Sequence, residues 1–271
     1  MYASGLHQHR FAPSAAVAPA VAALWVNECG FDTAGVSIPR AEPHLVVRFG
    51  PSARRGLDFH AIGARQRAHR KVIRSGQRTV MVRLHLGTHG AVFGVPSSVI
   101  ADRIVPLEDL WGVAATRELG ERLFEARQVP EVVAILEEVI ARRLPASEAH
   151  EAPTQLALDA AARLGTARVN DVAKALGVSE RTLRRVFREA VGMSPKEFSQ
   201  LTRFHRALRE ARAGLHVDWA GIASATGYYD QAHLIAEFRK IVGVTPRAFL
   251  GELRGAASST TGRERGARSE T

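Results

Sequence analysis

The clearest hydrophobic pattern in the chain lies over residues 179–192, where apolar and basic positions separate onto two faces of a helix. The apolar face consists of Leu183, Val186, Phe187, Ala190 and Val191, and the basic face consists of Arg181, Arg184, Arg185 and Arg188. Ser179 is a suitable N-cap and Gly192 suits the C-terminal turn. The pattern therefore predicts a helix that packs with one face and offers the other to an anion.

The first half of the chain has a different pattern. Short, β-branched and often alternating runs over 45–49, 57–62 and 79–86 are separated by glycines, which predicts a small antiparallel sheet or barrel. Helical spacing follows over 108–126 and 131–144, and the second of these segments carries one apolar stripe. That stripe either packs on its own domain or joins two subunits of a homodimer. The predicted fold class is α+β.

Composition divides the chain into four parts. Residues 145–154 are rich in proline, alanine and acidic residues and lack bulky apolar side chains, which is typical of a linker. We therefore expect a regulatory or dimerisation domain over 1–144 and an all-helical domain over 155–253. Residues 254–271 have no apolar period and are expected to form a disordered tail.

An internal repeat in the helical half gives the basic face a role. Residues 183–198 align without a gap to residues 234–249, and each copy follows a shorter helix and a glycine turn, at 172–177 and 222–227. This is a helix-turn-helix unit, present twice, and its second helix is the one that enters the DNA major groove. A helix over 195–213 of about 28 Å, at about 1.5 Å per residue, connects the two units.

Overall charge agrees with a polyanionic partner but does not define the fold. The formal net charge is +10 and the pI is about 10.8. The single cysteine, Cys29, excludes an internal disulfide and is interpreted as a buried thiol. Without a long apolar run or an export signal, we expect a cytoplasmic protein with no membrane partner.

Residues 155–253 resemble the C-terminal DNA-binding domain of the AraC/XylS family of bacterial transcription regulators, most strongly over 222–249. The resemblance implies seven helices, two recognition helices that read adjacent major-groove segments of double-stranded DNA, and recruitment or blocking of RNA polymerase. It places base readers at Arg181, Arg184, Arg185, Gln231 and His233. Thr182 joins them as a candidate DNA contact, and Arg188, Arg239 and Lys240 are expected to contact phosphate.

Two details modify this picture. Many family members carry a basic residue where this chain has Ala236, and acidic Glu237 follows it, so we expect the second unit to grip DNA more weakly than the first. Residues 79–112, and especially 94–112, resemble the uncharacterised N-terminal domain of a subset of AraC-type regulators, and this resemblance covers about residues 35–145. That resemblance implies sensing or dimerisation, with an unidentified small-molecule effector.

Other interpretations remain open at this point. One alternative is an enzyme or a metal-binding sensor in the N-terminal domain, and another is a nonspecific architectural DNA binder. Five histidines invite a metal site, although their spacing is not diagnostic: His44, His60, His69, His85 and His89. No catalytic motif is present, and we expect no enzyme, no cofactor and no metal.

Three smaller expectations concern single segments. Phe187, Phe238 and Trp219 are expected to lie in the core. Tyr228 and Tyr229 are expected to pack and fix a turn rather than stack on bases. The basic cluster at 65–71 either binds an anion or is a solvated loop.

Overall fold

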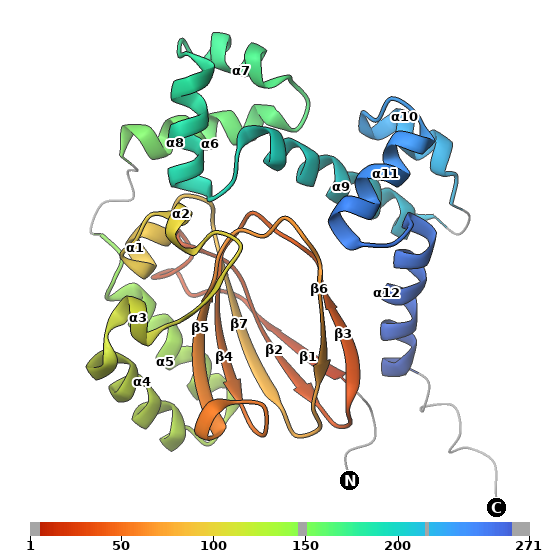
Figure 1. The fold of residues 1–271 in the computed structure, drawn as a ribbon. Helices are drawn as coiled ribbons and strands as arrows, with labels where there is room; N and C mark the ends of the chain where they lie inside the picture. Colours follow the sequence, from red (N-terminus) through yellow and green to blue (C-terminus); the bar gives the residue numbers. More distant parts are fainter. Residues whose placement is uncertain (1–5, 146–150, 215–216, 262–271) are drawn as a thin grey trace, which may run out of the picture.

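The computed structural model describes residues 6–145, 151–214 and 217–261. The N-terminal half forms an antiparallel sheet with helices on one side, and the C-terminal half is entirely helical (Figure 1). The α+β class predicted from the two hydrophobic patterns is confirmed.

The main sheet has six strands in the order β1-β2-β7-β4-β5-β8, and each neighbouring pair is antiparallel. The strands are β1 (Leu6–Phe11), β2 (Val21–Cys29), β4 (His44–Phe49), β5 (Leu57–Ile62), β7 (Arg78–Leu84) and β8 (Ile104–Pro106). A short 3-10 turn, η1 (Arg54–Gly56), joins β4 to β5. Two further strands, β3 (Thr33–Ser37) and β6 (His69–Ile73), pair separately as an antiparallel ribbon. Cys29 is buried, as expected.

Over residues 6–145 the structure has five helices: α1 (His89–Phe93), α2 (Ser97–Ile100), α3 (Glu108–Trp111), α4 (Val113–Glu125) and α5 (Val129–Ala141). The single helix predicted over 108–126 is wrong, because Gly112 has a φ of 84° and separates α3 from α4. On α5, Val132, Leu136 and Ile140 are buried in the core of the sheet domain. The apolar stripe therefore packs on its own domain.

The helical half contains seven helices within the described residues, as the family resemblance implies: α6 (Ala152–Leu164), α7 (Val169–Ala175), α8 (Glu180–Val191), α9 (Pro195–Ala213), α10 (Trp219–Thr226), α11 (Gln231–Val242) and α12 (Pro246–Thr261). Two predicted boundaries shift. Helix α6 begins at Ala152, inside the segment expected to be a linker, because Pro153 suits the first helical turn. Helix α12 continues to Thr261, past the expected end at residue 253. Residues 146–150 of the linker and 262–271 of the tail lie outside the described residues.

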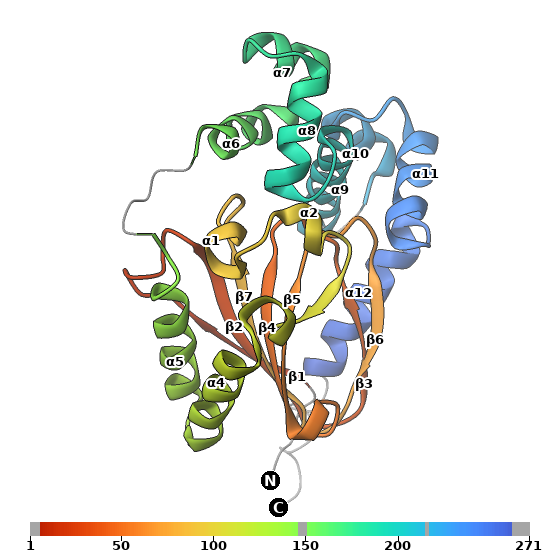
Figure 2. The same ribbon diagram turned by 60° about the vertical axis from the view of Figure 1, so that its left-hand side comes forward.

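The two halves pack against each other. Ala41 and Ala64 of the sheet domain belong to the same apolar cluster as the cores of α6, α8, α9 and α11. Figures 1 and 2 show the helical half seated across one end of the sheet, with α8 above α2 and α12 beside the β3–β6 ribbon. Two backbone approaches mark this interface, since the Ala68 N–H donates to the Ile241 carbonyl and Gly192 lies against Ser97.

Candidate nucleic-acid interface

The first helix-turn-helix unit consists of α7, a turn and α8. Gly177 lies in the turn with a φ of 67°, and the next N–H, of Val178, donates to the Ala173 carbonyl. The Ser179 side chain caps α8 by accepting from the Thr182 N–H at 3.1 Å. The predicted apolar face is confirmed, because all five of its residues are buried: Leu183, Val186, Phe187, Ala190 and Val191.

The opposite face of α8 carries the four arginines, and all of them are exposed. Arg184 pairs with Glu180, and Arg185 lies 3.5 Å from the Glu189 carboxylate; both pairs are one turn apart on the same helix. Arg181 and Arg188 have no ion-pair partner among the described residues. Exposed pairs of this kind contribute only about 0.3–0.5 kcal/mol, so all four guanidinium groups can exchange to a stronger anionic partner.

Thr182 occupies a different environment from the arginines. It is half-buried, and its hydroxyl lies 2.9 Å from the Ser179 hydroxyl. The capping arrangement therefore holds Thr182 at the first turn of α8, beside Arg181.

The second unit consists of α10, a turn at Gly227 and α11. Gly227 has a φ of 82°, and Asp230 caps α11 by accepting from the His233 N–H at 2.7 Å. Leu234, Phe238 and Val242 are buried, as the repeat predicts. Gln231, Ala236, Arg239 and Lys240 are exposed on the outer face of α11.

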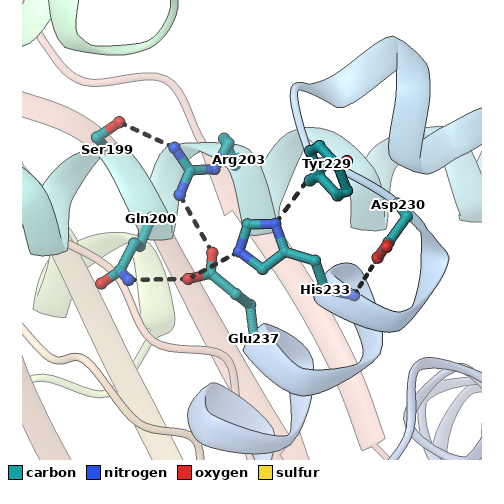
Figure 3. Close-up of polar contacts among 7 residues, drawn as sticks. All are labelled: Ser199, Gln200, Arg203, Tyr229, Asp230, His233 and Glu237. Atoms are coloured by element: carbon teal, nitrogen blue, oxygen red, sulfur yellow. Dashed lines mark hydrogen bonds and ion pairs between the residues drawn. The ribbon is translucent and has the colours of Figure 1, made fainter. Parts of the chain in front are cut away.

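His233 is placed differently from the other candidate base readers. Its Nδ1 accepts the Tyr229 N–H at 3.2 Å, its Nε2 lies 3.8 Å from a Glu237 carboxylate oxygen, and its ring packs edge-on against Tyr228. Figure 3 shows His233 directed toward Glu237 and toward the backbone of Tyr229, between α9 and α11. Both ring nitrogens are thus engaged by neighbouring groups within the protein.

Glu237, which with Ala236 led us to expect weaker DNA binding by the second unit, does not lie on the outer face of α11. Its side chain is 6% exposed and receives hydrogen bonds from Gln200 at 2.8 Å and Arg203 at 3.2 Å, both on α9. The carboxylate is therefore turned inward and neutralised by Arg203. The α9 partners escaped sequence analysis, although their spacing of three residues places them on one helical face.

The tandem tyrosines also diverge from expectation. Tyr228 is 5% exposed and packs in the core, but Tyr229 is 93% exposed. Burial and the neighbouring Glu237 charge raise the pKa of the Tyr228 phenol above its usual value of 10. Phe187 and Phe238 are buried as predicted, and Trp219 packs against the same cluster while half-buried.

Within the basic cluster at 65–71, His69, Arg70 and Lys71 lie on strand β6 rather than in a loop, and Arg70 makes contacts within the protein. Arg70 binds the Glu252 carboxylate of α12 through Nε at 3.2 Å and Nη2 at 3.0 Å, and it also donates to the Val242 carbonyl at 2.9 Å. Arg70 is thus a contact between the β3–β6 ribbon and the end of α11.

The histidines considered as an alternative metal site do not form one cluster among the described residues. His44 packs against Trp25, and His60 faces Asp58 at 3.3 Å. His89 is buried at the start of α1, where burial lowers its pKa to about 4; the buried His44 has a pKa of about 4 for the same reason. In the part of the chain that the structure describes, no group of three histidine, cysteine or acidic residues is arranged to hold a metal ion.

A comparison with protein families finds one match. Residues 172–252 match a family described as a helix-turn-helix domain. The match begins within α7 and ends within α12, so it includes both helix-turn-helix units. No curated protein matches the chain. No described helix is long and apolar enough to cross a bilayer.

Two solved structures show a weak overall likeness. ToxT from Vibrio cholerae O395 has a TM-score of 0.42 and 9% identity, over 93% of this chain and 99% of that one. Unsaturated fatty acid bound ToxT from Vibrio cholerae strain SCE256 has a TM-score of 0.39 and 11% identity, over 96% and 93%. At these values the likeness does not bear on the function of this chain.

Proposed function

We propose that this chain, whose C-terminal region is a DNA-binding helix-turn-helix domain of the AraC type, is a sequence-specific transcription regulator that reads two adjacent major-groove segments. It acts by recruiting or blocking RNA polymerase. The domain over 155–253 binds the DNA, and the domain over 1–144 controls it by binding an effector or a second copy of the chain. No catalytic step is assigned, and the protein works in the cytoplasm.

The observation that carries this proposal is the common orientation of the two recognition helices. The C-terminal end of α8 rests on the sheet domain where Gly192 meets Ser97, and the C-terminal end of α11 rests there through Ile241 and Val242. Both N-terminal ends therefore point away from the sheet domain (Figure 1). In helix-turn-helix proteins the N-terminal residues of the recognition helix contact base edges.

The connecting helix has a suitable length. Helix α9 spans 19 residues, which is about 28 Å at about 1.5 Å per residue. Successive major-groove segments on one side of a duplex are about 34 Å apart. The first unit packs on α9 through Phe187 against Phe198, and the second packs on it through Glu237 against Gln200 and Arg203. A single rigid helix thus supports both units, which favours their meeting the same side of the DNA.

The two units contribute unequally. In the first unit the exposed Arg181, Arg184 and Arg185 pair with guanine O6 and N7, and Arg188 contacts phosphate. In the second unit Gln231 reads adenine, while Arg239 and Lys240 contact phosphate. The exposed Ala236 adds no polar contact, so the first unit supplies most of the discrimination.

Selection of bound duplexes from random-sequence DNA by the full chain tests the proposal. We expect enrichment of a site with two conserved segments about one helical turn apart, the first more strongly conserved and rich in guanine. A pool that stays random while DNA is still retained would support the architectural alternative. Failure to retain any DNA would reject DNA binding itself.

A pocket between the domains supports an effector role. It has a volume of about 540 Å³ and lies between α9 and the segment that follows β3. Its lining combines apolar side chains with a basic set consisting of Arg40, His205, Arg206, Arg209 and Arg212, and the only acidic lining residue is Glu42. Such a lining suits an amphipathic anion, with its apolar part against Phe198 and its charge on the arginines.

Thermal unfolding of the full chain tests this role. A long-chain carboxylate such as oleate should raise the Tm, because a ligand that binds only the folded state stabilises it. Its methyl ester should have little effect, since it lacks the charge. An Arg209→Ala variant should lose the oleate response. Equal shifts with oleate and the ester would reject an anion site.

A further inference from the structure

The turn before α11 directs two consecutive tyrosines in opposite directions. The Tyr228 ring packs edge-on against His233 at 5.5 Å between centroids and is 5% exposed. Tyr229 is 93% exposed, and its hydroxyl makes no hydrogen bond with the described residues. Tyr229 immediately precedes Asp230, the N-cap of α11, and stands beside the exposed Gln231.

The backbone of Tyr229 is held even though its side chain is free. Its N–H donates to His233 Nδ1 at 3.2 Å, and the other ring nitrogen of His233 faces Glu237 at 3.8 Å. Glu237 is fixed in turn by Gln200 and Arg203 on α9 (Figure 3). A chain of polar contacts thus runs from the connecting helix to the backbone N–H of Tyr229, so the exposed phenol projects from a backbone position that is held in place.

We propose that Tyr229 is a DNA contact of the second unit, where its hydroxyl donates to a backbone phosphate beside the base pair read by Gln231. His233 does not read a base; it is a positioning residue that acts through Tyr229. This inference rests on the proposed function, because it requires α11 to enter the major groove by its N-terminal end.

Three physical points support a phosphate rather than a base as the acceptor. Tyrosine hydroxyls are among the side-chain donors that hydrogen-bond DNA phosphates. Tyr229 lies before the first residue of α11, outside the turn whose side chains reach base edges. The N-terminal end of a helix carries positive potential, which agrees with a phosphate nearby.

The test compares Tyr229→Phe with Tyr229→Ala on the duplex that the wild-type full chain selects from random DNA. Phe removes only the hydroxyl. We expect Phe and Ala to weaken binding similarly, by about tenfold, because both lose one hydrogen bond to a charged acceptor. Relative to the wild type, both variants should lose ethylation interference at one phosphate in the DNA segment bound by the second unit. Interference in the DNA segment bound by the first unit should remain unchanged.

Salt dependence separates this contact from a charged one. Tyr229 releases no counterion, so Tyr229→Phe should leave the slope of log K against log salt unchanged. Arg239→Ala is the matched control and should reduce that slope by about 0.9. A reduced slope with Tyr229→Phe would overturn the assignment.

The role of His233 is tested by a double-mutant cycle of His233→Ala and Tyr229→Phe. If His233 acts through Tyr229, the double variant should bind no more weakly than the weaker single variant. Base preference, measured by repeating the selection, should stay unchanged in every variant. Additive losses, or relaxed preference at one base pair with His233→Ala, would make His233 a base reader and overturn its positioning role.

The remaining outcomes are distinct. If Tyr229→Phe binds like wild type while Tyr229→Ala is weaker, the ring and not the hydroxyl makes the contact, and the phosphate assignment is overturned. If both variants bind like wild type, Tyr229 does not contact DNA. If the wild-type chain selects no site, the proposed function itself fails. The exposed Tyr229 should leave the Tm unchanged in each variant, which excludes misfolding as the cause of a loss.

Discussion

Gly192 lies so close to Ser97 that a Cβ at position 192 would stand 3.1 Å from the Ser97 carbonyl oxygen. The same Cβ would also approach Ala64 at 3.3 Å and Ala101 at 3.4 Å. The end of the first recognition helix is therefore seated on the sheet domain by close backbone contact, and a side chain at position 192 would require its neighbours to shift.

This contact predicts the effect of Gly192→Ala. The residue has a φ of 82°, so alanine adds backbone strain of about 1–2 kcal/mol, and crowding against Ser97 adds about 1–3 kcal/mol. Gly177→Ala is the matched control, because Gly177 has a φ of 67° and nothing within 4 Å of the added Cβ. Urea unfolding should show a larger loss for Gly192→Ala, and equal losses would contradict the close contact.

Arg184 and Arg188 should differ in their effects on DNA binding. Arg184→Ala should reduce preference for the selected site by about 1–3 kcal/mol, because a bidentate contact to guanine is lost. Arg188→Ala should weaken selected and random duplexes alike and reduce the salt slope by about 0.9, since it removes a phosphate contact. Competition binding at several salt concentrations measures both quantities. Identical losses on selected and random DNA for both variants would favour nonspecific binding.

Glu237→Ala should destabilise the fold strongly. Removing the carboxylate leaves Arg203 without its ion-pair partner at a site that is 25% exposed, and breaking a buried pair costs about 3–5 kcal/mol, so we expect a loss near the lower figure. Glu189→Ala breaks an exposed pair with Arg185 and should cost about 0.5 kcal/mol or less. Denaturant unfolding compares the two variants. A cost for Glu237→Ala as small as that of the control would show that Glu237 does not hold α11 to α9.

Stability should fall when the pH is lowered from about 6.5 to about 4. Burial holds the pKa of His89 at about 4 in the folded state, below the value of 6.5 in the unfolded chain. The unfolded state therefore binds more protons across this window, which removes up to about 3 kcal/mol of folding free energy. His44 contributes in the same direction, because burial also places its pKa at about 4.

His89→Leu tests that assignment. The variant should flatten the dependence of the unfolding free energy on pH between 6.5 and 4, because leucine fills the buried site without taking up a proton. An unchanged slope with His89→Leu would mean that this histidine is accessible to protons in the folded state.

The sequence predicted the recognition helices well because their information is local. Apolar spacing, the Ser179 cap and the glycine turn all lie within a few residues of α8, and the repeat shows the same arrangement around α11. The break at Gly112 was missed because the apolar spacing continues across it, and only the positive φ of that residue separates the helices.

The burial of Glu237 and the contacts of the partly exposed His233 could not be predicted in the same way. On α11 alone both residues lie beside the apolar face. The direction of Glu237 is decided by Gln200 and Arg203, more than thirty positions earlier in the chain, and His233 in turn lies 3.8 Å from Glu237. The contact between Arg70 and Glu252 joins residues 182 positions apart. Neither relationship leaves a periodic trace along the sequence.

The two helix-turn-helix units are attached to different parts of the sheet domain. Gly192 attaches the first unit through α2, and Arg70 attaches the second unit through the β3–β6 ribbon. The separation of the two recognition helices thus depends on the shape of the sheet domain as well as on the length of α9. A molecule that moved the ribbon relative to α2 would change which distance between half-sites the protein accepts. Control would then be exerted on the geometry of the operator, with every base-contacting side chain left as it was.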